Sequence, residues 1–219
     1  MSKVPDNIWL FRITHINNLD HILKHGLVTF HSPNADPDFV QIGDNTLIDL
    51  RVELEVPKSP FGKFSEYIPF YFGPRSPMLF QIATGYDGIK FFPQEEIIYV
   101  VSKLEILIKE GIPFVFTDGH ARAEITSFYG SNELDMLTEI DWYTVFNEKW
   151  NNDESDKDRQ RKKQAECLIF QYLPMYCIER ILVFNESAEE KVVSLIQKTE
   201  MTIPVQISKK AYYGHISNR

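Results

Sequence analysis

Cysteine is nearly absent from this 219-residue chain. The two that occur, Cys167 and Cys177, give neither a disulfide framework nor the ligand spacing of a zinc site. Apolar runs are also short: none reaches the roughly 18 to 20 residues that a membrane-spanning helix needs, and none near the start has signal-peptide length. We therefore expect a soluble, cytoplasmic protein with no membrane partner and no metal.

Positive charge is scarce, since 23 Lys and Arg stand against 31 Asp and Glu and the formal net charge is −8. An acidic chain of this kind lacks the broad electrostatic footprint with which proteins hold duplex DNA. One stretch departs from this pattern, and we call residues 157–163 the basic run; its cations are Lys157, Arg159, Arg161, Lys162 and Lys163. Composition alone favours a solvated helix face for such a run.

Common catalytic motifs are missing as well. The sequence contains no Walker loop, GxGxxG, GxSxG or HExxH, which removes the usual nucleotide-binding, hydrolase and zincin signatures. It also shows no repeat, low-complexity tract or Gly/Ser-rich linker. With 43% apolar and 25% charged residues, residues 1–219 are predicted to form a single globular domain.

Apolar periodicity predicts short strands and a few irregularly placed helices. Helices are expected from Asn17 or Asn18 to Gly26, from a capping box at Ser102 and Glu105 to Gly111, and over 187–200. Between them, 31–49 is expected to be an irregular loop, and 121–164 is expected to be mostly helix or loop. The predicted strands are 8–14, 50–56, 96–101, 112–117, 165–173, 178–184 and 203–207. This arrangement favours an α+β fold.

The segment 67–80 is aromatic and contains three prolines. Proline at these positions is predicted to exclude a long helix or a central strand. Its apolar residues are typical of a core, whereas Tyr71 and Arg75 could form a platform that stacks on an unpaired base. Composition does not choose between these two interpretations.

Several polar residues lie beside predicted strands: Thr14, His15, Arg51, His120 and Glu166. Glu166 stands in an apolar strand, where burying a carboxylate is costly unless it is paired or employed. The alternative is an outward-facing residue on an edge strand, which the two-residue period permits. Each histidine taken alone is more often structural than functional.

Six short motifs resemble one family in order and spacing over nearly the whole chain. They are Phe-Arg-Ile-Thr-His-Ile-Asn-Asn-Leu at 11–19, Ile-Leu-Lys-His-Gly at 22–26, Arg51, the aromatic Pro-rich segment 67–79, Asp-Gly-His-Ala at 118–121 and Ala-Glu-Cys-Leu at 165–168. Together they resemble DarT, a family of DNA ADP-ribosyltransferase toxins. The resemblance implies a compact α+β ADP-ribosyltransferase-like fold with a central, mostly antiparallel split β-sheet and flanking helices.

The resemblance also assigns site residues. Glu166 and Arg51 are implied to be catalytic, 31–50 to be an NAD-binding loop element and 121–165 a target-presenting region. The implied NAD⁺ contacts are Arg12, Ile13, Thr14, His15, His21, Thr29 and Arg51. Because the basic run directly precedes Glu166, we expect DNA contacts from Arg159, Arg161, Lys162 and Lys163. The other expected DNA contacts are Tyr71, Arg75 and His120.

The function implied is a toxin that transfers ADP-ribose from NAD⁺ to a base of single-stranded DNA, releases nicotinamide and blocks replication. A DarG-like macrodomain antitoxin is the implied partner. Arg12 and the segments 32–37 and 42–44 are closer to the guanine-modifying branch than to the thymine-modifying one, so guanine is favoured. Two alternatives stay open: an ADP-ribosyltransferase acting on RNA or protein, and a non-catalytic nucleic-acid-binding module.

Overall fold

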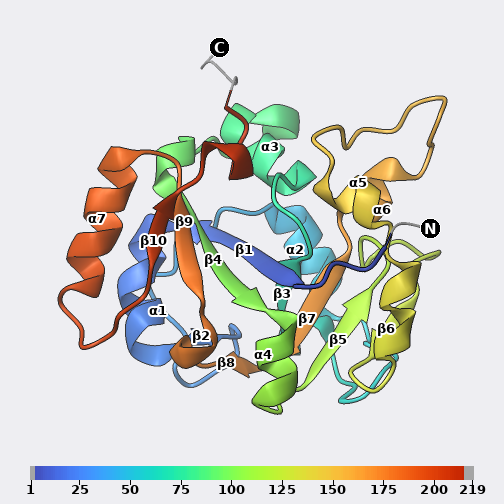
Figure 1. Cartoon of the computed structure of the whole chain (residues 1–219), viewed down its shortest axis with the longest axis horizontal. Helices are drawn as coiled ribbons and strands as arrows, with labels where there is room; N and C mark the ends of the chain where they lie inside the picture. The colour runs from blue at the N-terminus through green and yellow to red at the C-terminus, as the bar shows by residue number, and fades with distance from the viewer. Residues whose placement is uncertain (1–2, 215–219) are drawn as a thin grey trace.

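The protein folds around one long β-sheet, as the computed structural model in Figure 1 shows. The structure describes residues 3–214, except the side chains of 47–49 and 51. Eight strands follow the order β10-β9-β4-β1-β3-β7-β5-β6, and only β9 and β10 pair in parallel among the described residues. They are β1 (Trp9–His15), β3 (Tyr67–Tyr71), β4 (Ile97–Lys103), β5 (Phe114–Thr117), β6 (Phe128–Gly130), β7 (Glu166–Phe170), β9 (Arg180–Val183) and β10 (Val205–Ile207). The α+β class and the mostly antiparallel sheet are confirmed.

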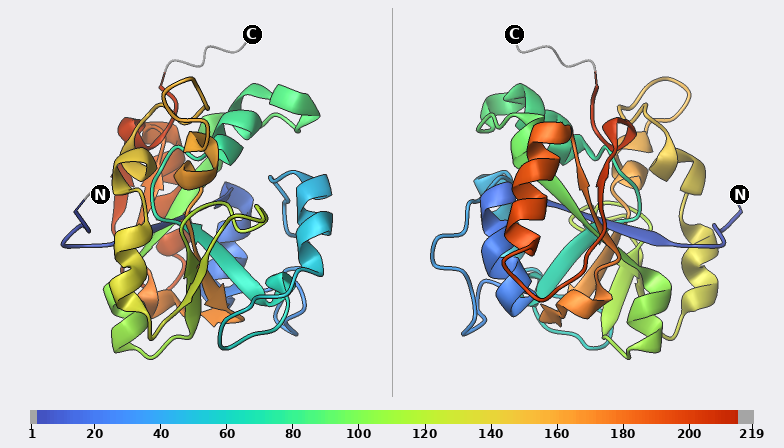
Figure 2. Two further views of the ribbon diagram at one scale, coloured as in Figure 1. Left: turned by 90° about the vertical axis from the view of Figure 1, so that its right-hand side faces the viewer. Right: turned by 60° about the vertical axis from the view of Figure 1, so that its left-hand side comes forward.

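Helices flank this sheet, and β2 (Leu27–Val28) pairs with β8 (Tyr172–Leu173) in a separate small sheet. The α-helices are α1 (Leu19–His25), α2 (Asn45–Val52), α3 (Pro77–Thr84), α4 (Leu104–Lys109), α5 (Trp142–Phe146), α6 (Arg159–Lys163) and α7 (Glu186–Ile196). Short 3-10 turns are η1 (Ile16–Asn18), η2 (Phe64–Glu66), η3 (Tyr86–Gly88), η4 (Gln94–Glu96), η5 (Leu134–Glu139), η6 (Met175–Cys177) and η7 (Lys209–Ala211). In the right-hand view of Figure 2, α7 lies alongside α1.

Both faces of the sheet are buried, one by a single large hydrophobic core and the other by two smaller ones. On one face, alternate residues such as Leu10, Phe70 and Val100 build a large core that includes α1, α4 and α7. On the other face, one core surrounds Phe11 and a second, smaller one surrounds Leu168. The boundary between these two cores follows the seam between β1 and β3.

That seam is where the sheet is weakly joined. β1 and β3 share the single register pair Phe11 and Tyr71, whereas β1 pairs with β4 along its whole length. Pro69 in β3 turns its carbonyl toward β1, where the Arg12 side chain donates to it over 2.9 Å. Proline has no N–H to contribute to a ladder, so it is tolerated in an inner strand at a place where the ladder is already open. The prediction that proline keeps 67–80 out of a central strand was wrong for this reason.

The start of the segment 45–56 was also predicted wrongly. The expected loop to 49 and strand over 50–56 are replaced by the helix α2, and Glu55 makes only an isolated bridge to Lys63. The Asp44 carboxylate accepts from the Thr46 N–H over 2.8 Å, a local turn that favours a helix start. The alternation of apolar residues here indicated a strand. That pattern contains no information about the contact of the Asp44 side chain.

A second correction concerns the helix after β4. The predicted capping box does not form, because Ser102 lies inside β4 and donates to the Cys177 carbonyl over 2.7 Å. Glu105 instead accepts from the Ile8 N–H over 3.0 Å. The helix itself is confirmed as α4, which begins at Leu104.

Two further strand boundaries differ from the prediction. β6 lies inside the stretch 121–164, which was expected to be mostly helix or loop. The single strand expected over 165–173 is divided into β7 and β8 by Gln171, whose φ of 56° interrupts the extended backbone. The strands predicted at 8–14, 96–101, 112–117, 178–184 and 203–207 and the helix at 187–200 are confirmed with shifted ends.

Gly73, in the turn after β3, gives a stability test. A Cβ built there lies 2.4 Å from the Val145 carbonyl oxygen. We predict that Gly73→Ala lowers the free energy of unfolding by about 1 to 3 kcal/mol, since this packing leaves no room for a methyl group. Gly214→Ala, where a Cβ meets nothing within 4 Å, is the matched control in urea denaturation. Equal stability of the two variants would refute the close packing of this turn on α5.

Candidate active site

A pocket of about 400 Å³ opens along the seam between β1 and β3. Its size falls within the range of small-molecule sites, roughly 300 to 1,000 Å³. Parts of η1, α1, α2, η2 and α3 and the segment 26–43 complete its walls. From the two strands, η1 and α1 its lining residues are Arg12, Ile13, Thr14, Asn18, His21, Ile22, Tyr67, Ile68, Pro69 and Tyr71.

Arg12 supplies a positive charge to this pocket. One terminal guanidinium nitrogen donates to the Pro69 carbonyl, and burial lowers the pKa of Arg12 to about 10, against the opposing effect of Tyr71. The guanidinium therefore remains cationic at neutral pH. Its Nε is buried and has no hydrogen-bond acceptor within the part of the chain that the structure describes. A bound ligand with an acceptor atom could satisfy this donor.

Asn18 fixes the far wall of the pocket. Its side-chain amide donates to the Thr14 hydroxyl over 2.9 Å and to the Val40 carbonyl over 3.0 Å. Its side-chain oxygen accepts from the Val40 N–H over 2.8 Å. Asn18 was predicted only as a helix cap, a bond its side chain does not make. Its near-complete burial is the structural signal of this role, which the sequence pattern did not reveal.

The residues expected to bind NAD⁺ divide into two groups. Arg12, Ile13, Thr14, His21 and Thr29 all line the pocket. His21 contacts the Asn34 carbonyl over 2.8 Å and so ties α1 to the wall segment.

His15 lies outside the pocket lining. Its Nδ1 accepts from the Asn17 N–H over 3.1 Å, and its Nε2 lies 3.3 Å from the Glu96 carboxylate. Its ring packs edge-on against Phe92. These contacts give His15 a structural role, and NAD⁺ binding by any of the six residues stays a prediction.

Glu166 begins β7 directly opposite Tyr71 of β3. Opposed residues of an antiparallel pair share a face, so the carboxylate lies next to a ring that lines the pocket. Glu166 is fully buried, and its backbone N–H donates to the Thr117 hydroxyl over 3.1 Å. β7 runs between β3 and β5. The alternative of an outward-facing residue on an edge strand was therefore wrong.

Arg51, the second expected catalytic residue, belongs to α2 by its backbone. Its side chain lies outside the described part of the structure. Its neighbour Val52 does line the pocket. The role of Arg51 accordingly stays a prediction.

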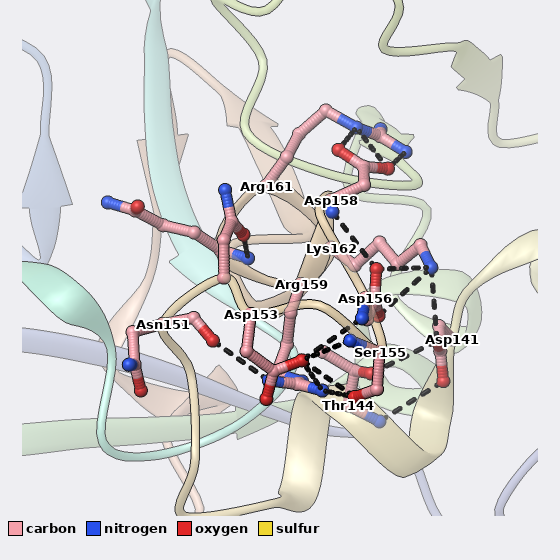
Figure 3. A network of polar contacts seen from close by, with 12 residues as sticks. Asp141, Thr144, Asn151, Asp153, Ser155, Asp156, Asp158, Arg159, Arg161 and Lys162 are labelled. Carbon is pink, nitrogen blue, oxygen red and sulfur yellow. Dashed lines mark hydrogen bonds and ion pairs between the residues drawn. The ribbon is translucent and has the colours of Figure 1, made fainter.

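Three cations of the basic run, Arg159, Arg161 and Lys162, are engaged with acidic residues, as Figure 3 shows. Arg159 forms a two-pronged contact with Asp153 at 2.7 and 3.1 Å, which holds the pKa of that carboxyl well below its usual range. Arg161 bonds to Asp158 at 2.8 Å and Asp118 at 3.0 Å. Lys162 lies 3.3 Å from Asp156. These pairs replace the free, solvated cations that composition had indicated.

Lys163 is the most buried member of the run, with 1% of its surface exposed. Its ammonium donates to the carbonyls of Val145 at 2.6 Å and Asn147 at 2.8 Å. Burial, assisted by the nearby charge of Arg75, lowers the pKa of Lys163 to about 7. Direct DNA contact by any cation of the run stays a prediction.

Arg75 and His120, also expected to contact DNA, have backbone partners, and Arg75 also lies 3.5 Å from the Glu148 carboxylate. The Arg75 guanidinium donates to the carbonyls of Lys210 and, over 3.2 Å, Phe146. The His120 N–H donates to the Arg161 carbonyl over 2.9 Å. Neither residue lines the pocket, whereas Tyr71 does.

Between residues 3 and 214, no cluster of three or more His, Cys, Asp or Glu side chains is arranged to hold a metal ion. No helix in the same range has the length and apolar character required to span a membrane.

Lys163 predicts a pH dependence of stability. Its folded pKa of about 7 lies below its ordinary value of 10.5, so between these values the unfolded chain binds the extra proton. Stability contributed by this site should therefore rise with pH across that window, by at most about 1.4 kcal/mol per pH unit. Urea denaturation of the wild type and of Lys163→Met from pH 7 to 9 measures the difference. The free energy of unfolding of the wild type minus that of Lys163→Met should rise with pH, and a value that stays flat or falls contradicts a buried, destabilised ammonium.

Comparisons with known proteins agree with this geometry. The family model described as DarT, ssDNA thymidine ADP-ribosyltransferase, matches residues 11–213. A DNA ADP-ribosyl transferase of Escherichia coli O127:H6 is 34% identical over 97% of both chains.

Solved structures of Thermus sp. 2.9 DarT are also similar. The complex with ADP-ribosylated ssDNA has a TM-score of 0.88 at 31% identity and covers 97% of this chain and 99% of that one. The complex with NAD⁺ has a TM-score of 0.82 at 32% identity, with 96% and 100% covered. A Thermosipho africanus fusion of a DNA ADP-ribosyl transferase with a DNA ADP-ribosyl glycohydrolase is 27% identical over 90% of this chain and 47% of the fusion.

The family match spans most of the chain, and the E. coli relative is similar from end to end. Of the residues that the resemblance assigns to the NAD⁺ site, Arg12, Ile13, Thr14, His21 and Thr29 line the seam pocket. Glu166 lies opposite Tyr71, whose side chain also lines it. This chain therefore belongs to the DarT family and is a DNA ADP-ribosyltransferase.

Proposed function

We propose that the chain transfers ADP-ribose from NAD⁺ to a base of single-stranded DNA, with Glu166 as the catalytic carboxylate. The observation that carries the proposal is the burial of Glu166 beside Tyr71 at the edge of the seam pocket. The Thermus relative that has been solved with NAD⁺ and with ADP-ribosylated ssDNA supports the same substrates here.

NAD⁺ occupies the pocket between β1 and the segment 26–43 in this proposal. Arg12 offers a fixed positive charge and a buried Nε donor. Thr14 and Thr29 add polar atoms to a wall that is otherwise largely apolar. Asn18 keeps that wall in place through Val40, so the pocket is preformed.

Glu166 acts on the ribose in the transition state. When the bond between nicotinamide and ribose breaks, its electron pair leaves with nicotinamide and positive charge grows on the ribose ring. A buried carboxylate stabilises that charge more than it stabilises the ground state. It can also accept a hydrogen bond from a ribose hydroxyl and orient the sugar. A base nitrogen then supplies the electron pair of the new bond and loses its proton.

The DNA substrate is single-stranded or locally opened, because a base inside a duplex cannot present its edge to a buried carboxylate. Tyr71 is well placed to stack on such a base, since its ring lines the pocket opposite Glu166. A cytoplasmic location follows from this substrate. Modification of RNA or protein is the competing outcome, and both polymers belong in the assay.

Thymidine is the target base that we put first, because the family that matches the chain is described by it. Guanine, favoured by Arg12 and by segments 32–37 and 42–44, is the second candidate. An arginine can read guanine through two hydrogen bonds, and Arg75 or a cation of the basic run is a candidate for this role. Arg75 donates to two backbone carbonyls and lies outside the pocket lining. The structure thus supplies no support for that reading by Arg75.

Oligonucleotides that each contain one reactive base type distinguish the two bases. After incubation with the protein and NAD⁺, mass spectrometry should find one added ADP-ribose on the oligonucleotide with thymidine. An adduct on the guanine oligonucleotide alone would place the chain in the guanine-modifying branch. Parallel incubations of the protein and NAD⁺ with RNA and with a protein extract test the competing substrates.

The partner of the enzyme in the cell is, in our proposal, a macrodomain antitoxin that removes the adduct. A relative in which transferase and DNA ADP-ribosyl glycohydrolase form one fused chain supports this pairing. Adducts on template bases would block replication, which accounts for toxicity when the glycohydrolase is absent.

Replacement of the catalytic carboxylate tests the mechanism. We predict that Glu166→Gln lowers kcat for DNA modification by about 10²- to 10³-fold, since the lost charge served the transition state. Glu110→Gln, an exposed change at the end of α4, is the control. Thermal unfolding and NAD⁺ titration calorimetry establish that the variant is folded and binds the co-substrate. Turnover retained within a factor of about ten would remove Glu166 from the mechanism.

A further inference from the structure

The carboxyl end of α5 is held by two cations from elsewhere in the chain. Lys163 donates to the carbonyls of Val145 and Asn147, and Arg75 donates to the carbonyl of Phe146 between them. The last carbonyls of a helix lack partners within the helix, and positive charge there is favourable. Three consecutive carbonyls at this end are thus satisfied by two side chains.

Arg75 connects this end of α5 to two further segments. Its backbone N–H donates to the Tyr99 hydroxyl over 3.1 Å, and its backbone carbonyl accepts from the Tyr213 hydroxyl over 2.7 Å. Its guanidinium also donates to Lys210 near the end of the described chain. The residue has a φ of 56°, an uncommon value for a side-chain-bearing residue that surrounding contacts must enforce.

Aromatic packing extends the same junction along the loop after α5. Trp150 lies 5.3 Å from the Phe80 ring of α3, and Phe80 lies 5.6 Å from Tyr213. The loop 147–158 is anchored again before α6, where Asp153 binds Arg159. Both ends of this loop are consequently tied to the body of the protein, and α6 leads within three residues to Glu166.

Neither cation is free to bind a phosphate directly. The Arg75 side chain is 12% exposed, and Lys163 is 1% exposed with its ammonium on two carbonyls. We propose that Arg75 and Lys163 are positioning residues that hold the loop 147–158 in the shape that receives single-stranded DNA beside Glu166. This inference rests on the proposed function, because it assigns the loop to DNA.

Substitution of Arg75 separates positioning from direct contact. In Arg75→Gln the carbonyl of Phe146 loses its charged donor, so the KM for the oligonucleotide should rise about tenfold or more. The dissociation constant for NAD⁺ should stay unchanged, since Arg75 does not line the pocket. The salt dependence of DNA binding should also keep its slope. Arg75→Lys, which retains the charge without the planar fork, should show a smaller rise.

The control is Lys191→Gln, which removes one exposed charge on α7 and should change none of these quantities. A salt slope reduced by about 0.7, the value of one phosphate contact on a single strand, overturns positioning in favour of direct contact. An unchanged oligonucleotide KM overturns the proposal as well. If Arg75→Gln does not fold, Arg75→Lys and Lys163→Met carry the same comparison.

Hydrogen exchange distinguishes failure of this proposal from failure of the proposed function. In Arg75→Gln, backbone amides of 145–158 should exchange faster than in the wild type while those of β7 stay protected. If the wild type modifies no DNA, the function fails, and faster exchange still establishes that Arg75 holds the loop. Unchanged exchange over 145–158 shows that Arg75 does not hold it.

Discussion

The contact between the Arg12 guanidinium and the Pro69 carbonyl lies at the place on which the site depends. β1 and β3 are neighbours in the sheet, yet they share a single register pair. Proline removes one potential ladder donor, and Arg12 occupies the open edge instead of a backbone N–H. The resulting seam is continuous with a pocket. On the sheet face opposite α1, α4 and α7, it separates the core around Phe11 from the core around Leu168. An ordinary ladder at this position would close the space where we place NAD⁺.

Most cations of the basic run are paired with acidic residues or buried, and few are exposed to solvent as free charges. The chain is acidic overall, and four of the five cations in its basic run are tied to Asp153, Asp156 and Asp158 or buried against carbonyls. Such pairs at partly exposed positions add little to stability individually. Their effect here is geometric, because they hold the loop 147–158 and α6 ahead of Glu166. In our proposal, recognition of a single strand depends on the shape of this loop and on aromatic stacking more than on a basic surface.

Much of this site could be predicted from sequence, and the exceptions share a cause. The polar residues at the end of β1 and the carboxylate in an apolar strand were both recognisable, because burying such groups is costly without a purpose. Local pattern could not show that Pro69 faces an open ladder or that Asn18 reaches Val40. Nor could it show that Arg161 meets Asp118, 43 residues away in the chain. Contacts of this kind are set by tertiary packing. The helix α2 was missed because apolar residues alternate over 50–56, a pattern that is typical of a strand.

The proposed mechanism requires NAD⁺ to bind in the seam between β1 and β3. Backbone hydrogen exchange with and without saturating NAD⁺ tests this directly, residue by residue. NAD⁺ should slow exchange over 26–43 and 64–71, which supply most of the pocket walls, and leave α4 and α7 on the opposite face unchanged. Protection confined to α4 or α7, or no protection of 26–43 at saturation, would contradict the assignment of the seam as the NAD⁺ site.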